Sequence, residues 1–239
     1  MNQRVKIAGQ GPFCYLRPAM QDLNTIILNL SIQLPGFLLA IVFHEAAHAY
    51  AAYKFGDHTS KYLGRLTLNP SAHIDPIGTI LFPVLGIVFG TIMFGWAKPV
   101  PVDFRQFKNI RQATFWVSFA GPLANILLCL IMALGLALFV TKVPSSFYLF
   151  DQVKSILLQA VIINIVLAVF NLLPFPPLDG SKMVESFLSY ENAMRFESLG
   201  RYSFIFFIIL MVTNFFSYIV TPFIMMAYWL VNYLVYIFG

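Results

Sequence analysis

Two histidines and a glutamate stand inside the apolar stretch "FLLAIVFHEAAHAYAAY", residues 37–53. His44 and His48 are four residues apart, so on a helix they lie on one face and can bind one metal ion. Glu45 lies beside them and can take a proton from a metal-bound water, whose pKa zinc lowers to about 7. The spacing therefore indicates a zinc-dependent hydrolase.

The alternative for a single histidine in an apolar helix is an ordinary packed polar residue. Each ionisable group inside a membrane costs about 3 kcal/mol or more, so such groups mark functional sites by default. Two histidines with an adjacent glutamate favour the metal site over this alternative.

A catalytic zinc needs a third protein ligand. Asp179 lies in "NLLPFPPLDG", residues 171–180, where Pro-Leu-Asp-Gly alone is an ordinary turn signal. The prolines end the preceding apolar run early, and irregular backbone in a membrane is tolerated where it lines a cavity. This backbone can aim Asp179 at the depth of His44. Spacing alone leaves Glu185 and Glu191 open as alternative third ligands.

The elements that must position these residues are membrane segments. Of the 239 residues, 59% are hydrophobic and 10% are charged, whereas a soluble domain carries about 25% charged residues. The sequence predicts an all-α polytopic membrane protein, a bundle of about five to six transmembrane or re-entrant segments. The long apolar runs fall at 25–53, 77–97, 113–141, 155–173 and 202–238.

Two of these runs do not fit one simple span. Run 202–238 is too long and contains Thr221-Pro222, so it is two segments or one long kinked helix. Run 77–97 has basic clusters on both sides, and the positive-inside rule places both clusters in the cytoplasm. We therefore expect run 77–97 to be re-entrant. The same rule puts His44 and Asp179 towards the cytoplasmic side, although basic residues near the N-terminus favour the opposite orientation.

A small β element is expected near the site. Residues 65–68 in "GRLTLNPSAHIDPIG" alternate with period two, which predicts a short strand. "WAKPVPV", 96–102, is a second extended piece whose prolines suit an edge. An unwound substrate can join such a strand by β-addition. The expected substrate contacts are Gly64, Arg65, Leu66, Thr67 and Leu68.

Several classes of protein are disfavoured. Cys14 and Cys129 lie far apart, which argues against a disulfide framework and a cysteine metal site. The net charge of +5 is explained by basic residues next to membrane spans, without nucleic acid. We expect one domain, 1–239, with a polar N-terminal extension at 1–22 to which no role is assigned and no convincing signal peptide.

Three motifs occur in order: "HEAAH", "GPLAN" at 121–125 and "FNLLPFPPLDG" at 170–180. Together they resemble the signatures of the site-2 proteases, the intramembrane zinc metalloproteases. The "GRLTLNPSAHIDPIGT" and "GWAKPVPV" segments are similar to the compact branch without PDZ or CBS domains. The resemblance implies that His44, His48 and Asp179 bind one zinc ion per chain and that Glu45 is the catalytic acid and base.

The resemblance also implies roles for two asparagines. Asn171 would stabilise the developing oxyanion or bind the substrate backbone, and Asn125 would hold an unwound substrate strand. The alternative for both is polar contact between helices, worth about 1 kcal/mol. His73 is expected near the site as a structural hydrogen-bonding residue rather than a ligand.

The expected function is intramembrane endopeptidase activity on single-span membrane proteins, as in regulated intramembrane proteolysis. The resemblance implies an integral protein of a prokaryotic inner membrane, in contact with the lipid bilayer, with the site towards the cytoplasm. Three alternatives stay open: a membrane metalloprotease with Glu185 or Glu191 as ligand, a zinc transporter with a transit site at His44, His48 and Asp179, and a pseudoprotease that only binds membrane segments. The sequence leaves the substrate and the oligomeric state open.

Overall fold

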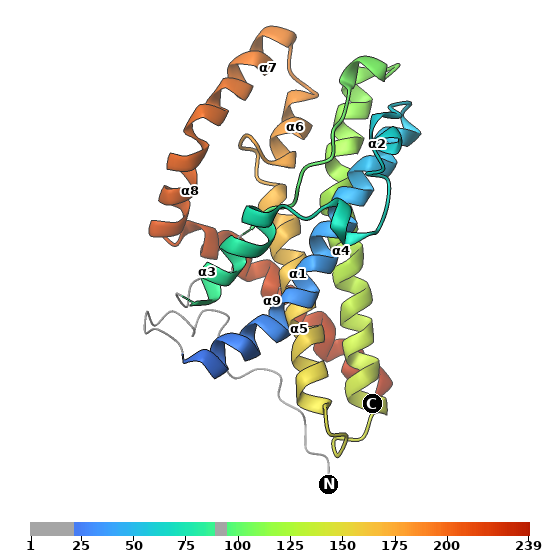
Figure 1. The fold of residues 1–239 in the computed structure, drawn as a ribbon, viewed down its shortest axis with the longest axis vertical. Helices are drawn as coiled ribbons and strands as arrows, with labels where there is room; N and C mark the ends of the chain where they lie inside the picture. Colours follow the sequence, from blue (N-terminus) through green and yellow to red (C-terminus); the bar gives the residue numbers. More distant parts are fainter. Residues whose placement is uncertain (1–21, 89–94) are drawn as a thin grey trace.

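The computed structural model describes residues 22–88 and 95–239. Most of the predicted N-terminal extension and part of the predicted run 77–97 therefore lie outside the described residues. Within these ranges, four helices are long and apolar enough to cross a membrane, and the expectation of an all-α polytopic membrane protein is confirmed (Figure 1). They are α1 (Leu23–Lys54), α4 (Ile110–Lys142), α5 (Phe150–Asn171) and α9 (Phe215–Phe238).

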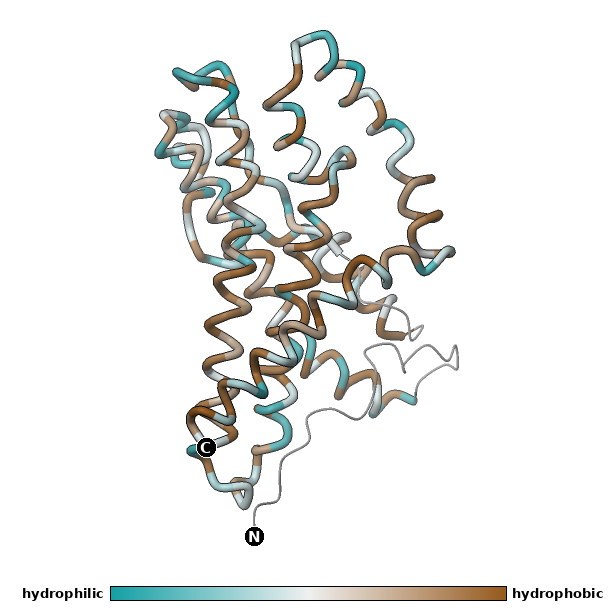
Figure 2. Tube along the Cα trace, turned by 180° about the vertical axis from the view of Figure 1, so that it is seen from behind, coloured by the Kyte–Doolittle hydropathy of each residue, from teal (hydrophilic) through white to brown (hydrophobic). Residues whose placement is uncertain are grey.

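The four long helices form one bundle, in which α1, α4 and α5 pack against one another and α9 packs on α4 and α5. Small residues allow close approach: a Cβ on Gly36 of α1 would lie 2.9 Å from the Cα of Ala160 in α5. Hydrophobic residues run along these helices (Figure 2). Hydrophilic residues gather near α2 (Thr59–Tyr62), near the start of α4 and along α7 (Tyr190–Glu197).

The segment between α1 and α4 contains a short apolar excursion, of which residues 76–88 and 95–96 are described. It begins with a π-helical turn, η2 (Pro76–Leu81), and continues as α3 (Phe82–Val88). At about 1.5 Å per residue this apolar stretch is too short to span a bilayer. The Trp96 N–H donates to the Gly78 carbonyl at 3.1 Å. The two ends of the excursion therefore meet, which is what a re-entrant segment requires.

The C-terminal run forms two helices, one of the two predicted alternatives. They are α8 (Ser203–Val212) and α9, and the chain turns between them at Asn214, whose φ of 54° is left-handed. Asparagine tolerates this conformation better than most residues. The break is therefore at Asn214, and Pro222 lies inside α9. Between α5 and α8 come α6 (Asp179–Glu185), α7 (Tyr190–Glu197) and η4 (Ser198–Tyr202).

The predicted strand at 65–68 is wrong, because the parts of the chain that the structure describes contain no strand. Gly64 has a φ of +67° and turns the chain. The buried Arg65 donates its N–H to the Ser60 carbonyl at 2.8 Å, while Leu68 is 55% exposed. A period-two pattern over four residues was too short to outweigh these local contacts. Between this turn and η2 lies the 3-10 turn η1 (Pro70–Ala72), and η3 (Phe104–Gln106) precedes α4.

Candidate metal centre

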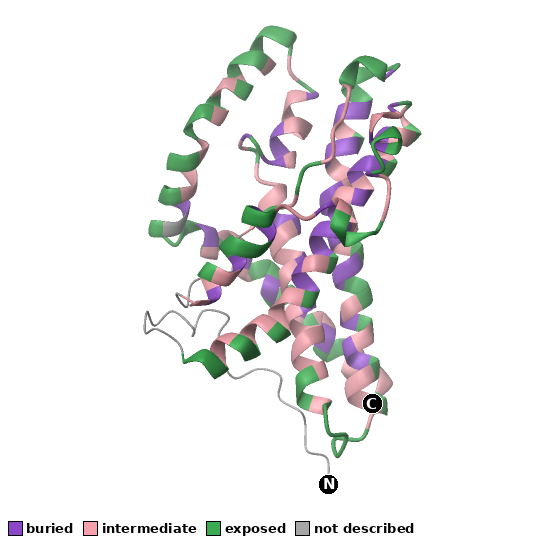
Figure 3. Ribbon diagram, viewed as in Figure 1, coloured by how far each residue is buried: buried purple, intermediate pink, exposed green. Residues whose placement is uncertain are grey.

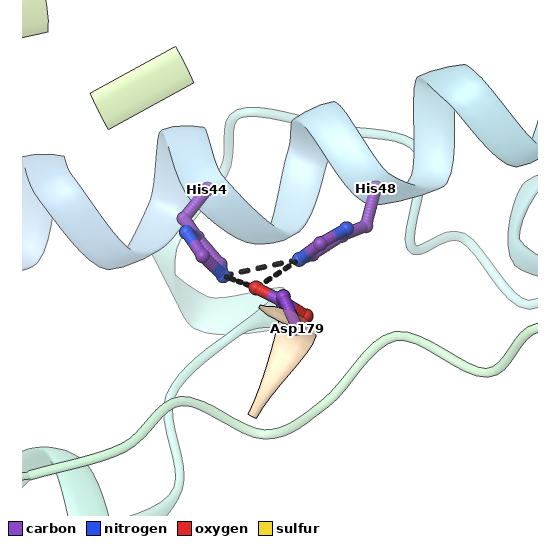
Figure 4. A group of neighbouring side chains, drawn as sticks. All are labelled: His44, His48 and Asp179. Carbon is purple, nitrogen blue, oxygen red and sulfur yellow. Dashed lines mark hydrogen bonds and ion pairs between the residues drawn. The ribbon is translucent and has the colours of Figure 1, made fainter. Parts of the chain in front are cut away.

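His44 and His48 point from one face of α1 towards the first residue of α6, Asp179 (Figure 4). The Nε2 atoms of the two histidines are 3.0 Å apart. Asp179 Oδ2 lies 3.1 Å from Nε2 of His44 and 3.3 Å from Nε2 of His48. Both histidines are buried and Asp179 is partly buried. The structure thus brings together the three residues that the resemblance implied as metal ligands.

The hydrogen bonds on the far side of each imidazole fix its tautomer. His48 Nδ1 lies 2.7 Å from the Val117 carbonyl, which only accepts, so Nδ1 carries the proton. His44 Nδ1 lies 2.7 Å from Asn125 Oδ1. The amide nitrogen of Asn125 is committed to other acceptors, so Oδ1 is the acceptor for His44. With its proton on Nδ1, an imidazole that is neutral presents an unprotonated Nε2 to the other ring and to Asp179, which is the form that binds a metal.

In the form that binds a metal, the lone pairs of two imidazoles and one carboxylate oxygen converge on the same point. Asp179 Oδ2 is buried, and the polar atoms nearest to it are the two imidazole Nε2 atoms. Two lone pairs and a carboxylate at this distance repel unless a cation, either a proton on an imidazole or a metal ion, lies among them. Two imidazoles and a carboxylate, each oriented from behind, are a donor set that suits catalytic zinc.

Asn125 orients a ligand, and this corrects the expectation that it contacts substrate. Its side chain is fully buried. Its amide nitrogen donates to the Ala40 carbonyl and to Asn164 Oδ1, each at 3.0 Å. Asn164 is fully buried too and donates to the Ala160 carbonyl at 2.8 Å. A substrate strand has no access to such an amide.

Gly121 of α4 lies directly against the two imidazoles. A Cβ at this position would lie 2.4 Å from His48 Nε2 and 2.7 Å from His44 Nε2. Only a glycine lets the α4 backbone come this close, and the approach also brings the Val117 carbonyl within reach of His48. The glycine of "GPLAN" therefore belongs to the construction of the site, a role that the sequence did not reveal.

Glu45 is held by the main chain of the loop between α3 and α4. Its Oε2 accepts the Val100 N–H at 2.8 Å. We call residues 96–103 the strap. Residues 96–102 were expected to form an extended edge; they lie in neither a helix nor a strand and are bonded to other segments. The structure thus places Glu45 beside the metal ligands on α1 with one carboxylate oxygen occupied.

Side chains from the α1–α3 region fasten the strap. The buried Arg65 donates to the Lys98 carbonyl at 2.5 Å and to the Pro99 carbonyl at 3.1 Å. The Ser60 hydroxyl donates to the Pro101 carbonyl at 2.7 Å. The Asp103 N–H donates to the buried Asp57 carboxylate at 2.8 Å. Arg65, expected to contact substrate, therefore anchors the strap.

The remaining expected substrate contacts, Gly64, Leu66, Thr67 and Leu68, lie in the turn after α2. The Thr67 carbonyl, which substrate pairing would need, already lies 2.8 Å from Nε2 of the fully buried His73. His73 thus has the structural hydrogen bond that was expected of it. Loss of the strand removes the basis for pairing substrate at 64–68.

Asn171 is the last residue of α5 and donates its side-chain amide to the Leu167 carbonyl, one turn earlier, at 3.1 Å. This bond directs the side chain back along its own helix. The structure does not group Asn171 with His44, His48 and Asp179, so its catalytic role stays a prediction.

The two rival acids have other partners. Glu185 accepts from Lys182 at 3.2 Å, and burial raises the pKa of its carboxyl while Lys182 acts against that rise. Glu191 is paired with Arg195 at 2.6 Å on the exposed face of α7. Among the described residues, the histidine, cysteine and acidic side chains that meet closely enough to share a metal are His44, His48 and Asp179. The geometry favours Asp179 as the third ligand.

Comparison with known proteins agrees with this chemistry. The sequence profile of Peptidase family M50 matches residues 145–213, which include Asp179. The chain is 43% identical over 189 residues to the "Putative zinc metalloprotease YwhC" of Bacillus subtilis, covering 77% of this chain and 82% of that protein. It is 31% identical to the "Putative zinc metalloprotease Rip2" of Mycolicibacterium smegmatis, covering 74% of this chain and 65% of that protein. No solved structure gave a significant match.

Proposed function

Because the chain belongs to peptidase family M50, the site-2 proteases, we propose that it is a zinc-dependent endopeptidase that cuts other proteins in or next to their membrane-spanning segments. The observation that carries the proposal is the meeting of three side chains: His44 and His48, on a helix of membrane-spanning length, and Asp179 at the start of α6. Glu45 lies beside the two histidines on the same long helix. A soluble substrate would not require this chemistry to be built among apolar helices.

Each residue of the site has a separate role in this proposal. His44, His48 and Asp179 hold zinc, which when bound polarises the scissile carbonyl and makes a water nucleophilic at neutral pH. Glu45 takes the proton from the attacking water and returns it to the leaving amine. The Val100 N–H occupies one oxygen of Glu45 and leaves the other for the water. Asn171 is proposed to stabilise the negative charge on the carbonyl oxygen once substrate is bound.

The direct test measures zinc and activity together. The purified protein should contain one zinc ion per chain. His44→Ala, His48→Ala and Asp179→Ala should each lose it, whereas Glu45→Gln should keep zinc and lose cleavage of a single-span substrate. If Asp179→Ala kept its zinc while Glu185→Ala lost it, the third ligand would be wrongly assigned.

The same variants separate a protease from a transporter. A transit site needs the ligands but has no use for Glu45 as a base. Zinc uptake into proteoliposomes that survives Glu45→Gln, without any proteolysis by the unaltered protein, would favour transport. To identify the substrates, Glu45→Gln can be co-expressed with membrane proteins, and those that it retains can be determined.

We further propose that residues 1–239 act as a single unit in the prokaryotic inner membrane, with the site towards the cytoplasm. The basic residues that follow α1 and precede α4 support this orientation. Cysteines placed at Lys61, Lys108 and Lys182 should react with a reagent added on the cytoplasmic side. A cysteine at Ser145, in the α4–α5 loop, should not, and cytoplasmic labelling there would reverse the orientation.

A further inference from the structure

The ten-residue helix α8 has one face turned to the rest of the protein and one face exposed. Phe204 and Val212 are 76% and 77% exposed, and the exposed side of α8 is visible in Figure 3. The inward positions recur at helical spacing, which indicates a packing face. They are Ser203, Phe206, Phe207 and Leu210.

This inward face packs on the connection that carries Asp179, residues 172–178. The rings of Phe206 and Phe175 stack with centroids 3.8 Å apart and an interplanar angle of 11°. The Ser203 hydroxyl lies 3.1 Å from the Pro176 carbonyl and closer still to the Gly200 carbonyl, so its single proton is shared between these two acceptors. One turn further on, Phe207 lies against Phe170 near the end of α5, with centroids 5.6 Å apart.

A displacement of Phe175 would be transmitted to Asp179, because the residues between them are closely bonded and packed. The Leu178 N–H donates to the Phe175 carbonyl at 3.0 Å, and Leu178 directly precedes Asp179. The start of α6 also packs closely against the end of α5, because a Cβ on Gly180 would lie 2.3 Å from the Leu172 carbonyl oxygen. The connection is thus held between α5 on one side and α8 on the other.

A second contact joins α6 to α7, the helix that precedes α8 in the chain (Figure 1). Lys182 of α6 pairs with Glu185 of the same helix at 3.2 Å and with Glu197 at the end of α7 at 3.1 Å. The carboxylate of Glu197 lies shortly before Ser203 in the chain, so the start of α8 is tied to the helix that begins at Asp179.

We propose that α8 is a brace for the third metal ligand, and that Phe206, through its stack on Phe175, is a positioning residue that sets how tightly the metal is held. The inference rests on the proposed zinc site. A ligand must be held within about 0.5 Å of its productive position by the residues that support it. Loss of such outer support lowers metal affinity by about 10–100-fold in other proteins.

The test compares Phe206→Ala with Phe204→Ala, its matched control on the exposed face of α8. Zinc affinity is measured on the full chain in nanodiscs by competition with a chromophoric chelator. Phe206→Ala should bind zinc about tenfold or more weakly, and Phe204→Ala should equal the unaltered protein. Phe206→Tyr keeps the stacked ring and should restore the affinity. With cobalt in place of zinc, the visible absorption bands should change only in Phe206→Ala.

A general loss of folding is separated from the proposed effect in two ways. The metal-free forms are compared by thermal unfolding, and Ser203→Ala supplies a milder variant that should weaken zinc binding a few-fold in the same direction. The proposal would be overturned if Phe206→Ala and Phe204→Ala bound zinc equally well. It would also be overturned if Ser203→Ala bound zinc more weakly only in proportion to a lower thermal stability of its metal-free form. If the unaltered protein bound no zinc, the proposed function itself would fail.

Discussion

Substitution of Gly121 by alanine tests the packing of the metal centre with a single added methyl group. The new Cβ would lie 2.4 Å from His48 Nε2 and 2.7 Å from His44 Nε2. Non-bonded heavy atoms settle near 3.5 Å, so α4 has to retreat by about 1 Å or the imidazoles have to turn away. Either movement displaces the atoms that would bind the metal.

The retreat of α4 has a second effect, because the same helix carries the groups that orient both rings. The Val117 carbonyl and Asn125 Oδ1 each lie 2.7 Å from a histidine Nδ1. A retreat of about 1 Å breaks both hydrogen bonds and frees the rings to rotate. We expect Gly121→Ala to lower zinc affinity about 100-fold or more, which corresponds to about 2.7 kcal/mol.

The assay is chelator competition on the purified protein, combined with cleavage of a helical membrane substrate. Gly135→Ala is the matched control, because Gly135 lies in the same helix and its added Cβ would meet nothing within 4 Å. The control should keep its zinc and gain up to about 1 kcal/mol of helix stability. If Gly121→Ala held zinc as tightly as Gly135→Ala, the close approach of α4 to the imidazoles would be refuted.

Three further results are expected. Val100→Pro deletes the N–H that donates to Glu45 and should lower kcat about tenfold or more without loss of zinc. Val100→Ala keeps this N–H and should have a near-normal kcat. Equal kcat values for the two variants would exclude this contact from catalysis. Asn125→Ala should weaken zinc binding about 10–100-fold, and unchanged affinity would argue against its orienting role. Removal of zinc by a chelator should lower the free energy of unfolding by about 2.7 kcal/mol relative to protein with free zinc at 100 times its Kd, and an unchanged melting temperature would contradict zinc binding to the folded site.

The sequence predicted the parts of the site that depend on local spacing. His44 and His48 could be paired because a helix puts residues four apart on one face. The long helices followed from apolar length alone. The third ligand could not be chosen by spacing, because the approach of α6 to α1 depends on how α5 ends and on the packing around the connection. Only the resemblance to the site-2 proteases favoured Asp179 over Glu185 at that stage.

The errors have a common physical origin. The strand at 65–68 failed because the backbone groups it needed were already bonded within the turn and the buried side chain was Arg65 rather than a leucine. Asn125 was expected at the substrate, but its partners, two carbonyl-type oxygens and a histidine, come from two other helices, α1 and α5. Val100 and Gly121 were missed because each acts through its backbone, and a sequence pattern shows side chains.

The hydrogen bond from the Val100 N–H to Glu45 provides a spectroscopic reporter of the charge on this carboxylate. Val100 stands between Pro99 and Pro101, so it has the one amide proton in that tripeptide, and this proton points at Oε2 of Glu45. The amide nitrogen and proton shifts of this residue should therefore follow the charge on the carboxylate as it gains and loses a proton. Selective 15N labelling of valine, with Val100→Ala to assign the signal, would let the ionisation of the proposed general base be followed by magnetic resonance without altering any residue of the site.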